Sequence, residues 1–297
     1  MRKKELWLGG LFTLAGVFGS CTNEMEYESQ NNKYPMELTA EKATMSFTRT
    51  VTEKTEWNGG EEVSLYDGFA QKVYQISADG GMTAKDNDPL YWYTTTEEET
   101  LFAWYPATGT LLTEWSVAAD QTAEDAYKKS DFLYAYEKMK FRSERRLQFR
   151  HGVVKLVLNV KGDGKTVTSE DLQNAVITVE NTVLKGVLSE GKLSLGENTE
   201  MAVIKPYVLT AKEGYVHSLQ LLVIPQDMSG KKFFKVAIGA KEYYYTPANG
   251  EGILESGHQY TYNVGVGKPG LVVTLAKESV EWGDSEDENI PSDNIAG

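Results

Sequence analysis

Few side chains in the 297-residue chain have the types and spacing that catalysis or metal binding requires. The three histidines are His151, His217 and His258, and no pair of them has the HExxH spacing of a zinc protease. The chain also lacks a GxSxG motif, which would present a nucleophilic serine. Isolated histidines are more often bonded to backbone groups in a core, and we predict such a buried role for His151. We therefore expect no catalytic residues, no metal site, no cofactor and no enzymatic activity.

Two glycine-rich stretches match nucleotide-binding motifs only in part. Residues 265–270 match GxGxxG, but the apolar Leu271–Leu275 that follows indicates a strand, where a dinucleotide site requires a helix. Residues 162–166 are similar to the end of a phosphate-binding loop, but Asn159 stands where that motif requires glycine. We interpret both stretches as turns between strands.

A few acidic and aromatic stretches could bind small ligands. Asp86, Asn87 and Asp88 could contact a cation, but Pro89 and the missing downstream Glu depart from a calcium loop. The run Glu97–Glu99 is most simply a solvated loop. Trp92 and Tyr243–Tyr245 could stack on sugars, although such residues more often form the faces of strands.

The only cysteine, Cys21, follows a short segment with the layout of a secretory signal peptide. The basic Arg2–Lys4 precedes an apolar run, Leu6–Phe18, which is shorter than the roughly 20 residues that a transmembrane helix needs. A cysteine after such a run resembles a bacterial lipobox. We predict a lipoprotein signal peptide at 1–20, acylation of Cys21 and a flexible tether at 21–35; the alternative is an ordinary signal peptide with an incidental cysteine.

The net charge of −13 excludes two classes of partner. It would repel the phosphates of nucleic acid and the head groups of anionic lipids. One cysteine cannot form a disulfide within the chain, so stability must come from buried apolar surface.

The elements that must carry these residues are strands. Apolar residues alternate with others over residues 153–160, 219–223, 234–238 and 260–266, and glycine turns such as Asn58–Gly60 separate the runs. Short helices are expected only at 123–129 and 169–174. We predict an all-β protein with two consecutive antiparallel β-sandwich domains, at 36–162 and 163–284, and an acidic tail at 285–297.

A series of short motifs, in a fixed order after the lipobox, resembles the fimbrillin family of Bacteroidales. These motifs are Arg49, Trp57–Gly60, Val63–Tyr66, Pro89–Trp92, Leu101–Pro106, Ser130–Ala135, Leu147–His151, Leu254–Tyr262 and Val280–Trp282. The family comprises fimbrial stalk, tip and anchor subunits, and the similarity extends over nearly the whole mature chain.

The resemblance implies a fold, a cellular location and a mode of assembly. It implies transthyretin-like sandwich domains and a lipoprotein exposed on the cell outer membrane. It also implies that a protease cuts after a basic residue, here Arg49, so that loss of the first strand opens a groove. The C-terminal strand of another subunit then fills the groove; here the candidate donor residues are Leu271, Val273, Leu275 and Val280.

Two functions remain open at this point. The first is a structural or adhesive fimbrial subunit whose partners are other fimbrial subunits, outer-membrane lipid through acylated Cys21, and a surface receptor. The alternative is a monomeric outer-membrane surface lipoprotein that binds glycan or host protein and does not polymerise.

Overall fold

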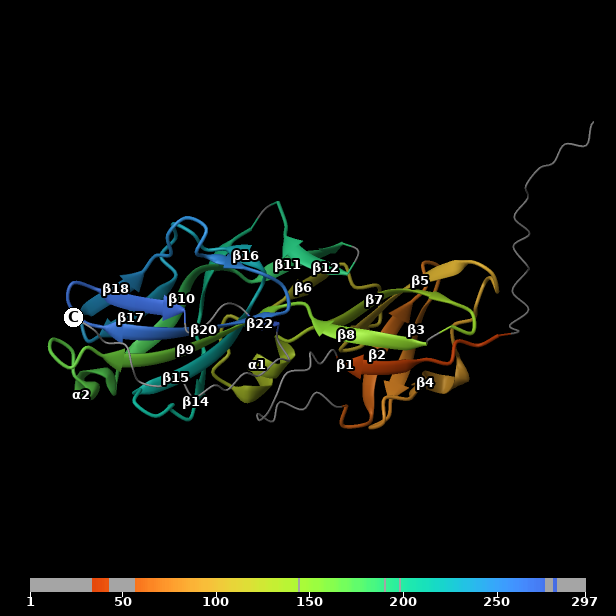
Figure 1. Cartoon of the computed structure of the whole chain (residues 1–297), viewed down its shortest axis with the longest axis horizontal. Helices are drawn as coiled ribbons and strands as arrows, with labels where there is room; N and C mark the ends of the chain where they lie inside the picture. The colour runs from red at the N-terminus through yellow and green to blue at the C-terminus, as the bar shows by residue number, and fades with distance from the viewer. Residues whose placement is uncertain are drawn as a thin grey trace, which may run out of the picture.

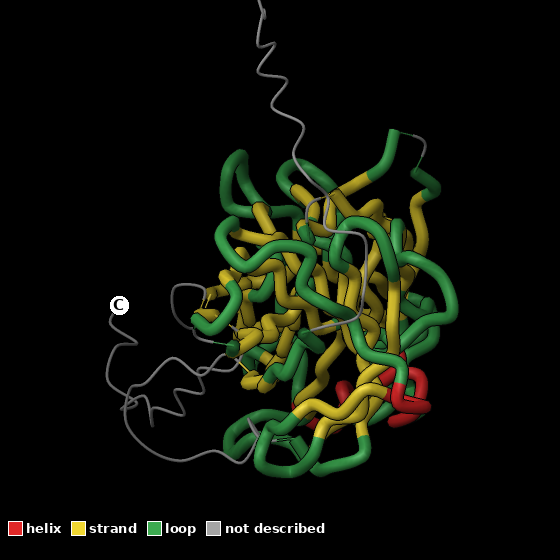
Figure 2. The backbone as a smooth tube through the Cα atoms, turned by 90° about the vertical axis from the view of Figure 1, so that its right-hand side faces the viewer, coloured by secondary structure: helices red, strands yellow, loops and turns green. Residues whose placement is uncertain are grey.

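The computed structural model describes residues 34–42, 57–143, 145–189, 191–197, 199–275 and 280–281. These residues form an elongated molecule that consists mostly of strands (Figure 1). The strands form its body, and the few helical turns lie at its edge (Figure 2). The all-β prediction is confirmed, whereas the transthyretin-like arrangement of two domains stays a prediction.

The strands form five sheets. The seven-stranded sheet contains, in spatial order, β1 (Thr39–Lys42), β8 (Arg146–His151), β7 (Leu133–Lys140), β5 (Glu98–Tyr105), β2 (Glu61–Tyr66), β3 (Gln71–Ile76) and β4 (Met82–Ala84). The six-stranded sheet contains β14 (Tyr207–Leu209), β15 (His217–Val223), β9 (Val154–Gly162), β20 (His258–Val266) and β21 (Leu271–Leu275), and β22 (Val280–Glu281) also pairs with β20.

Three smaller sheets complete the fold. They contain β13 (Met201–Ile204), β10 (Val176–Val183), β17 (Phe234–Ile238) and β18 (Lys241–Tyr245); β12 (Lys192–Leu195), β11 (Lys185–Ser189) and β6 (Glu114–Ser116); and β16 (Gln226–Asp227) with β19 (Ile253–Leu254). The helices are the 3-10 turn η1 (Lys85–Asn87), α1 (Glu124–Lys129) and α2 (Ser169–Leu172). The two expected helices are confirmed as α1 and α2.

The sequence analysis predicted antiparallel pairing throughout, but two of the pairs are parallel. β1 runs parallel to β8, and β9 runs parallel to β20. Alternation of apolar residues determines which face of a strand is buried but not the direction of its neighbour, so the sequence pattern could not have indicated these two pairs.

The buried apolar side chains form two clusters. The N-terminal core contains Met36, Leu38, Ala40, Trp57, Val63, Leu65, Tyr74, Ile76, Leu101, Leu147 and Phe149, among others. The C-terminal core contains the alternating Leu156, Leu158 and Val160 of β9 together with residues of β10, β15, β17 and β20. β9 ends at Gly162 and pairs with β15 and β20, so the six-stranded sheet begins before the predicted boundary at residue 162.

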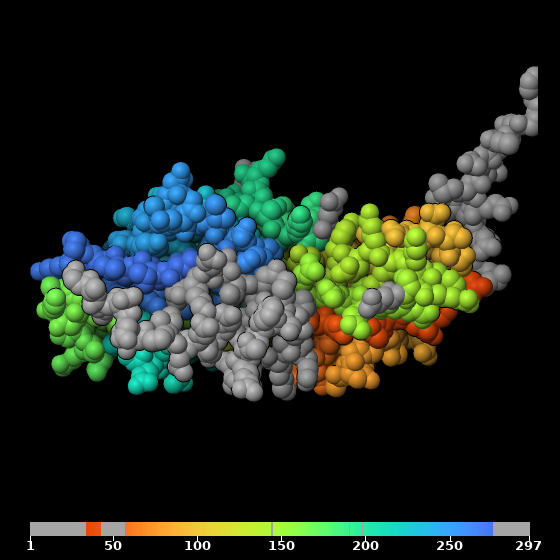
Figure 3. Space-filling model, viewed as in Figure 1, coloured from red at the N-terminus to blue at the C-terminus, as the bar shows by residue number. Residues whose placement is uncertain are grey.

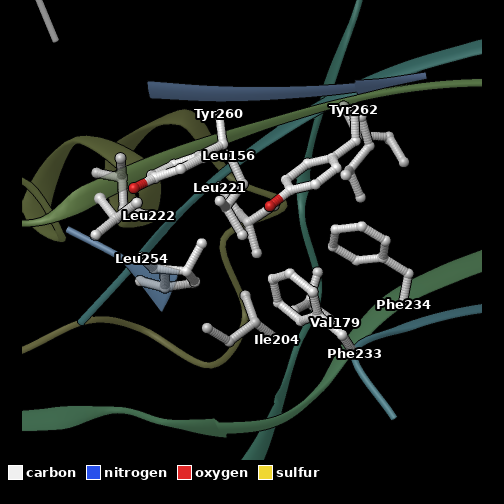
Figure 4. Packing of buried hydrophobic residues seen from close by; sticks show 14 of the residues in the cluster. Leu156, Val179, Ile204, Leu221, Leu222, Phe233, Phe234, Leu254, Tyr260 and Tyr262 are labelled. Carbon is white, nitrogen blue, oxygen red and sulfur yellow. The ribbon is translucent and has the colours of Figure 1, made fainter. Parts of the chain in front are cut away.

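Aromatic rings fill much of the C-terminal core. Figure 4 shows Phe233, Phe234 and Tyr262 packed together; the ring centroids of Phe233 and Phe234 are 4.1 Å apart, and those of Phe234 and Tyr262 are 4.9 Å apart. Burial raises the pKa of the Tyr262 phenol. In Figure 3, the earlier part of the described chain lies toward one end of the long axis and the later part toward the other, so the two cores lie one after the other.

Candidate functional site

The first described segment, residues 34–42, has alternating buried and exposed side chains and ends in the strand β1. Met36, Leu38 and Ala40 are buried, whereas Glu37 and Thr39 between them are exposed. This period of two is what places one face of a strand on a core. The three buried side chains therefore fill a continuous strip of the N-terminal core.

Backbone hydrogen bonds hold residues 34–42 on both sides. On one side, β1 pairs in parallel with β8, with Ala40 beside Leu147 and Lys42 beside Phe149. On the other side, the Ala40 amide donates to the Gly80 carbonyl at 2.8 Å, and the Met82 amide donates to the Leu38 carbonyl at 3.1 Å. β1 therefore occupies a slot one strand wide between β8 and the β3–β4 hairpin (Figure 1).

The hairpin can approach β1 closely because its turn contains glycine. Gly80 has φ +86°, which only glycine adopts readily, and a Cβ there would lie 2.6 Å from the Ala40 carbonyl oxygen. From the sequence alone, Asp79–Gly81 indicates only a turn. The adjacent Gly80 and Gly81 were the one signal that another backbone lies against this turn.

The ends of the slot carry further contacts. The Trp57 Nε1–H donates to the Ala40 carbonyl at 3.2 Å, and the Lys42 ammonium lies 4.6 Å from the centre of the Trp57 ring. Burial lowers the pKa of Lys42. Before β1, the Met36 amide donates to the Leu90 carbonyl at 2.8 Å. The contacts thus continue along the whole of residues 34–42.

Withdrawal of residues 34–42 would leave an open slot in the N-terminal core. The buried Met36 and Leu38 side chains contribute roughly 1.5–3 kcal/mol each, and the amides and carbonyls of β8 and the hairpin would lose their partners. A slot of this kind can be refilled by any extended segment with apolar residues at a spacing of two.

The candidate donor strand lies in the other part of the molecule. β21 pairs antiparallel with β20 at the end of the six-stranded sheet, so Leu271 and Val273 are half-buried against the C-terminal core. Leu275 is exposed. Val280 is in β22, which pairs with Gln259, and its side chain is outside the described part. The structure does not bring β1 and β21 together within one chain.

Two predicted site residues fall where the structure describes nothing. Cys21 precedes the first described residue, and Arg49 lies in the stretch 43–56 between β1 and Trp57. Both therefore stay predictions. In the same way, the predicted signal peptide, tether and acidic tail are outside the described residues, except for positions 34 and 35.

The three histidines each bond to a neighbouring group. His151 Nδ1 lies 2.9 Å from Asp131 Oδ1, His217 Nε2 lies 2.7 Å from the Leu172 carbonyl, and His258 Nδ1 lies 3.0 Å from the Ser256 carbonyl. Within the described residues, no group of three or more His, Cys, Asp or Glu side chains is placed to hold a metal ion. Over the same residues, no helix is long and apolar enough to cross a membrane.

The acidic and aromatic stretches differ in where they lie. Trp92 is buried in the N-terminal core, and Tyr243–Tyr245 lie half-buried along β18. The expected solvated loop at Glu97–Glu99 is wrong in part, because β5 begins at Glu98 and Glu99 is half-buried. The sequence could not indicate the burial of Glu99, because a carboxylate is buried where backbone amides bond to it and the sequence pattern does not locate those amides.

Comparisons with known proteins agree on one family. Residues 44–281 match the family model described as Fimbrillin-like. The curated Bacteroides uniformis protein "Putative fimbrium subunit Fim1C" is 25% identical over 194 residues, which are 61% of this chain and 63% of that protein. The match thus covers less than two thirds of that relative.

Two solved structures share the fold. One, described as a putative cell adhesion protein from Bacteroides ovatus, has a TM-score of 0.63 at 20% identity and covers 85% of this chain and 99% of its own. The other, with the same description, is from Bacteroides uniformis; it has a TM-score of 0.61 at 19% identity and covers 84% of this chain and 99% of its own.

Proposed function

Since the chain belongs to the fimbrillin-like family, we propose that it is a surface subunit of a fimbrium that assembles by exchange of β-strands between copies or related subunits. In this proposal, proteolysis after Arg49 frees residues 34–42, and the slot between β8 and the β3–β4 hairpin accepts a strand from another subunit. Its role is structural or adhesive rather than enzymatic.

One observation carries this proposal: residues 34–42 contact a backbone on each side and place Met36, Leu38 and Ala40 in the N-terminal core. A strand in this position is held entirely by contacts that a second extended segment can reproduce. The peptide bond that would have to be cut, after Arg49, lies between β1 and Trp57 in the sequence.

The spacing of the candidate donor supports the same proposal. Leu271, Val273 and Leu275 are two residues apart, as are Met36, Leu38 and Ala40. β21 is the last strand at its end of the six-stranded sheet, so its transfer would break the pairing with β20 alone. The strand would exchange its place on one subunit for the slot of the next.

The remaining features of the proposal come from the sequence and the family. We place the subunit on the outer face of the cell outer membrane, attached before processing by acyl chains on Cys21. We also propose that each of the two cores belongs to one transthyretin-like domain. β9 lies in the six-stranded sheet, so it counts with the C-terminal core although it precedes the predicted boundary at residue 162.

The test follows the oligomeric state of the purified protein after cleavage by an arginine-specific protease. We expect the cut wild-type chain to form a ladder of oligomers by size-exclusion chromatography with light scattering, and Arg49→Ala to stay monomeric. Leu275→Asp should also stay monomeric, because it places a charge on the apolar face of the donor. Thr274→Asp is the matched control, since Thr274 is an equally exposed neighbour on the opposite face, and it should assemble.

The alternative function makes the opposite forecast. If the wild-type chain stays monomeric after a verified cut at Arg49, or if Arg49→Ala assembles equally well, strand exchange is wrong. An observation that favours the alternative is the aromatic pair of Phe69, which is 70% exposed, and Tyr93, with ring centroids 4.9 Å apart, since such rings can stack on sugars. The protein would then be a monomeric surface lipoprotein that binds glycan.

A further inference from the structure

Ala40 has the smallest of the three buried side chains that residues 34–42 place in the slot. The residue is only 1% exposed, and its carbonyl accepts a hydrogen bond from the Trp57 indole N–H at 3.2 Å. On the hairpin side, its amide donates to the Gly80 carbonyl at 2.8 Å, and on the other side it pairs with Leu147 of β8. The slot is therefore filled at this position by a single methyl group.

The surroundings of Ala40 are fixed by their own contacts. The Trp57 ring packs edge-on against Phe149 and Tyr105, with ring centroids 5.3 and 6.0 Å apart. The Gly80 turn lies so close that a Cβ there would be 2.6 Å from the Ala40 carbonyl oxygen. A larger side chain at position 40 would have to displace core side chains or lift the backbone away from its hydrogen bonds. It would therefore overpack the N-terminal core.

The candidate donor strand of this chain does not match this position. When its apolar residues are aligned with those of residues 36–42, the two segments read LVVTLAK and MELTAEK. This register also aligns Thr274 with Thr39 and ends both segments in lysine. It places Leu275 at the position of Ala40, with an isobutyl group where the slot holds a methyl group.

The rim of the slot adds a preference for acidic residues. Glu37 forms an ion pair with Arg145 at 2.8 Å, and Glu41 forms one with Arg146 at 3.1 Å. The register above places uncharged residues of a second copy at both of these positions. Because exposed ion pairs contribute little binding free energy, they affect the choice of partner and its register more than the strength of binding.

We infer that the preferred partner of the slot is a strand of a different subunit, with alanine at the position of Ala40 and acidic residues at those of Glu37 and Glu41, rather than a second copy of this chain. The Ala40 position then determines the specificity of the slot. A second copy can still exchange, but overpacking by Leu275 weakens its binding about tenfold or more. This inference rests on the proposed exchange of strands.

The first test measures the uptake of fluorescently labelled peptides by the full chain after cleavage at Arg49. The native peptide, residues 34–42, should displace the bound segment, which fluorescence anisotropy detects. The peptide with Ala40→Leu should require a concentration at least about tenfold higher for the same uptake. The peptide with Thr39→Leu is the matched control, because it has the same larger side chain at the exposed neighbouring position, and it should bind as the native peptide does.

The second test compares donors in the assembly of the cut chain. Leu275 is 44% exposed in β21, so Leu275→Ala disturbs its own surroundings little and removes the mismatch with the slot. By light scattering, this variant should assemble at a concentration about tenfold lower than the wild type. Val272→Ala is the matched control: it removes apolar atoms from a 67% exposed position of the same strand and should assemble as the wild type does.

The outcomes separate this inference from the proposed function. If the cut chain takes up no native peptide, strand exchange itself is wrong, and the inference is overturned with it. If the cut chain takes up the native and Ala40→Leu peptides equally, strand exchange stands but the Ala40 position does not select the partner. The preference for a different subunit is also overturned if Leu275→Ala assembles no better than the wild type.

Discussion

At the scale of single residues, exposed acids stabilise turns through bonds to backbone amides. Asp163 illustrates this after β9: its Oδ1 accepts from the amides of Lys165, Thr166 and Val167, and its Oδ2 accepts from the Thr166 hydroxyl. The Thr166 hydroxyl oxygen in turn accepts from the Lys268 amide in the β20–β21 connection. A short acidic turn thus supports the strand that we propose as donor.

These bonds predict how stability depends on pH. They favour the ionised form and hold the pKa of Asp163 far below its usual value, with the Thr166 hydroxyl bond as the largest cause. A lowered pKa in the folded state means that the contribution is complete above the unfolded value, about 3.9, and is lost as the pH falls below it. Asp163→Asn should therefore unfold at lower urea concentration than wild type at pH 7, and the difference should shrink as the pH is lowered from 4 to 2. A difference that grew toward low pH would contradict this account.

At the scale of elements, the segment 34–42 that ends in β1 contributes three buried side chains to the N-terminal core. Leu38 is 4% exposed, so Leu38→Ala should reduce the free energy of unfolding of the uncut chain by about 2–5 kcal/mol, because it removes buried methyl groups and leaves a cavity. Thr39→Ala, at the exposed neighbouring position of the same segment, should change it by no more than about 1 kcal/mol. Urea denaturation of both variants measures the difference. Equal effects would mean that β1 does not contribute to the core in solution.

The elements also show how far the sequence reading could go. Alternation over residues 153–160 and 260–266 identified β9 and β20, because one face of each strand is buried. It could not show that these two strands are parallel neighbours, since pairing depends on contacts between residues that are far apart in the sequence. The candidate site was predictable in the same partial way: the resemblance indicated a first strand near Arg49, but the hairpin around Gly80 that forms its second wall depends on tertiary packing.

The partial burial of Glu99 could not be predicted from the sequence for a similar reason. Glu99 sits in a run of three glutamates, which normally indicates a solvated segment. Only the hydrogen bonds from the Tyr93 and Thr94 amides show that its carboxylate is turned toward the protein. A local pattern reports the average environment of a segment and cannot identify one member that is turned inward.

At the scale of the whole molecule, the two cores draw on the same stretch of chain and are not independent: Leu101 and Ala103 of β5 belong to the N-terminal core. Phe102, Trp104, Val117 and Phe132 precede residue 162 in the sequence but belong to the C-terminal core. β6, from the same stretch of chain, pairs with β11. The segment between β5 and β7 therefore joins the two parts of the molecule. Unfolding of one core should reduce the stability of the other.

Gln121 provides the sharpest test of this coupling. It is fully buried, and its side chain bonds to both backbone groups of Leu222 in β15, with distances of 2.8 Å to the carbonyl and 2.8 Å to the amide. Gln121→Ala would leave these two groups buried without partners, at a cost of about 1–3 kcal/mol each. We expect differential scanning calorimetry to show one cooperative transition for the wild type and the same single transition at lower temperature for the variant. Thr122→Ala, an exposed neighbour, should leave the transition within about 1 °C of wild type, since surface changes of this kind alter stability little. If the wild type instead melts in two steps and Gln121→Ala shifts only one of them, the two cores unfold separately. Strand exchange at the N-terminal core could then proceed without disturbing the C-terminal strand that the same subunit must donate.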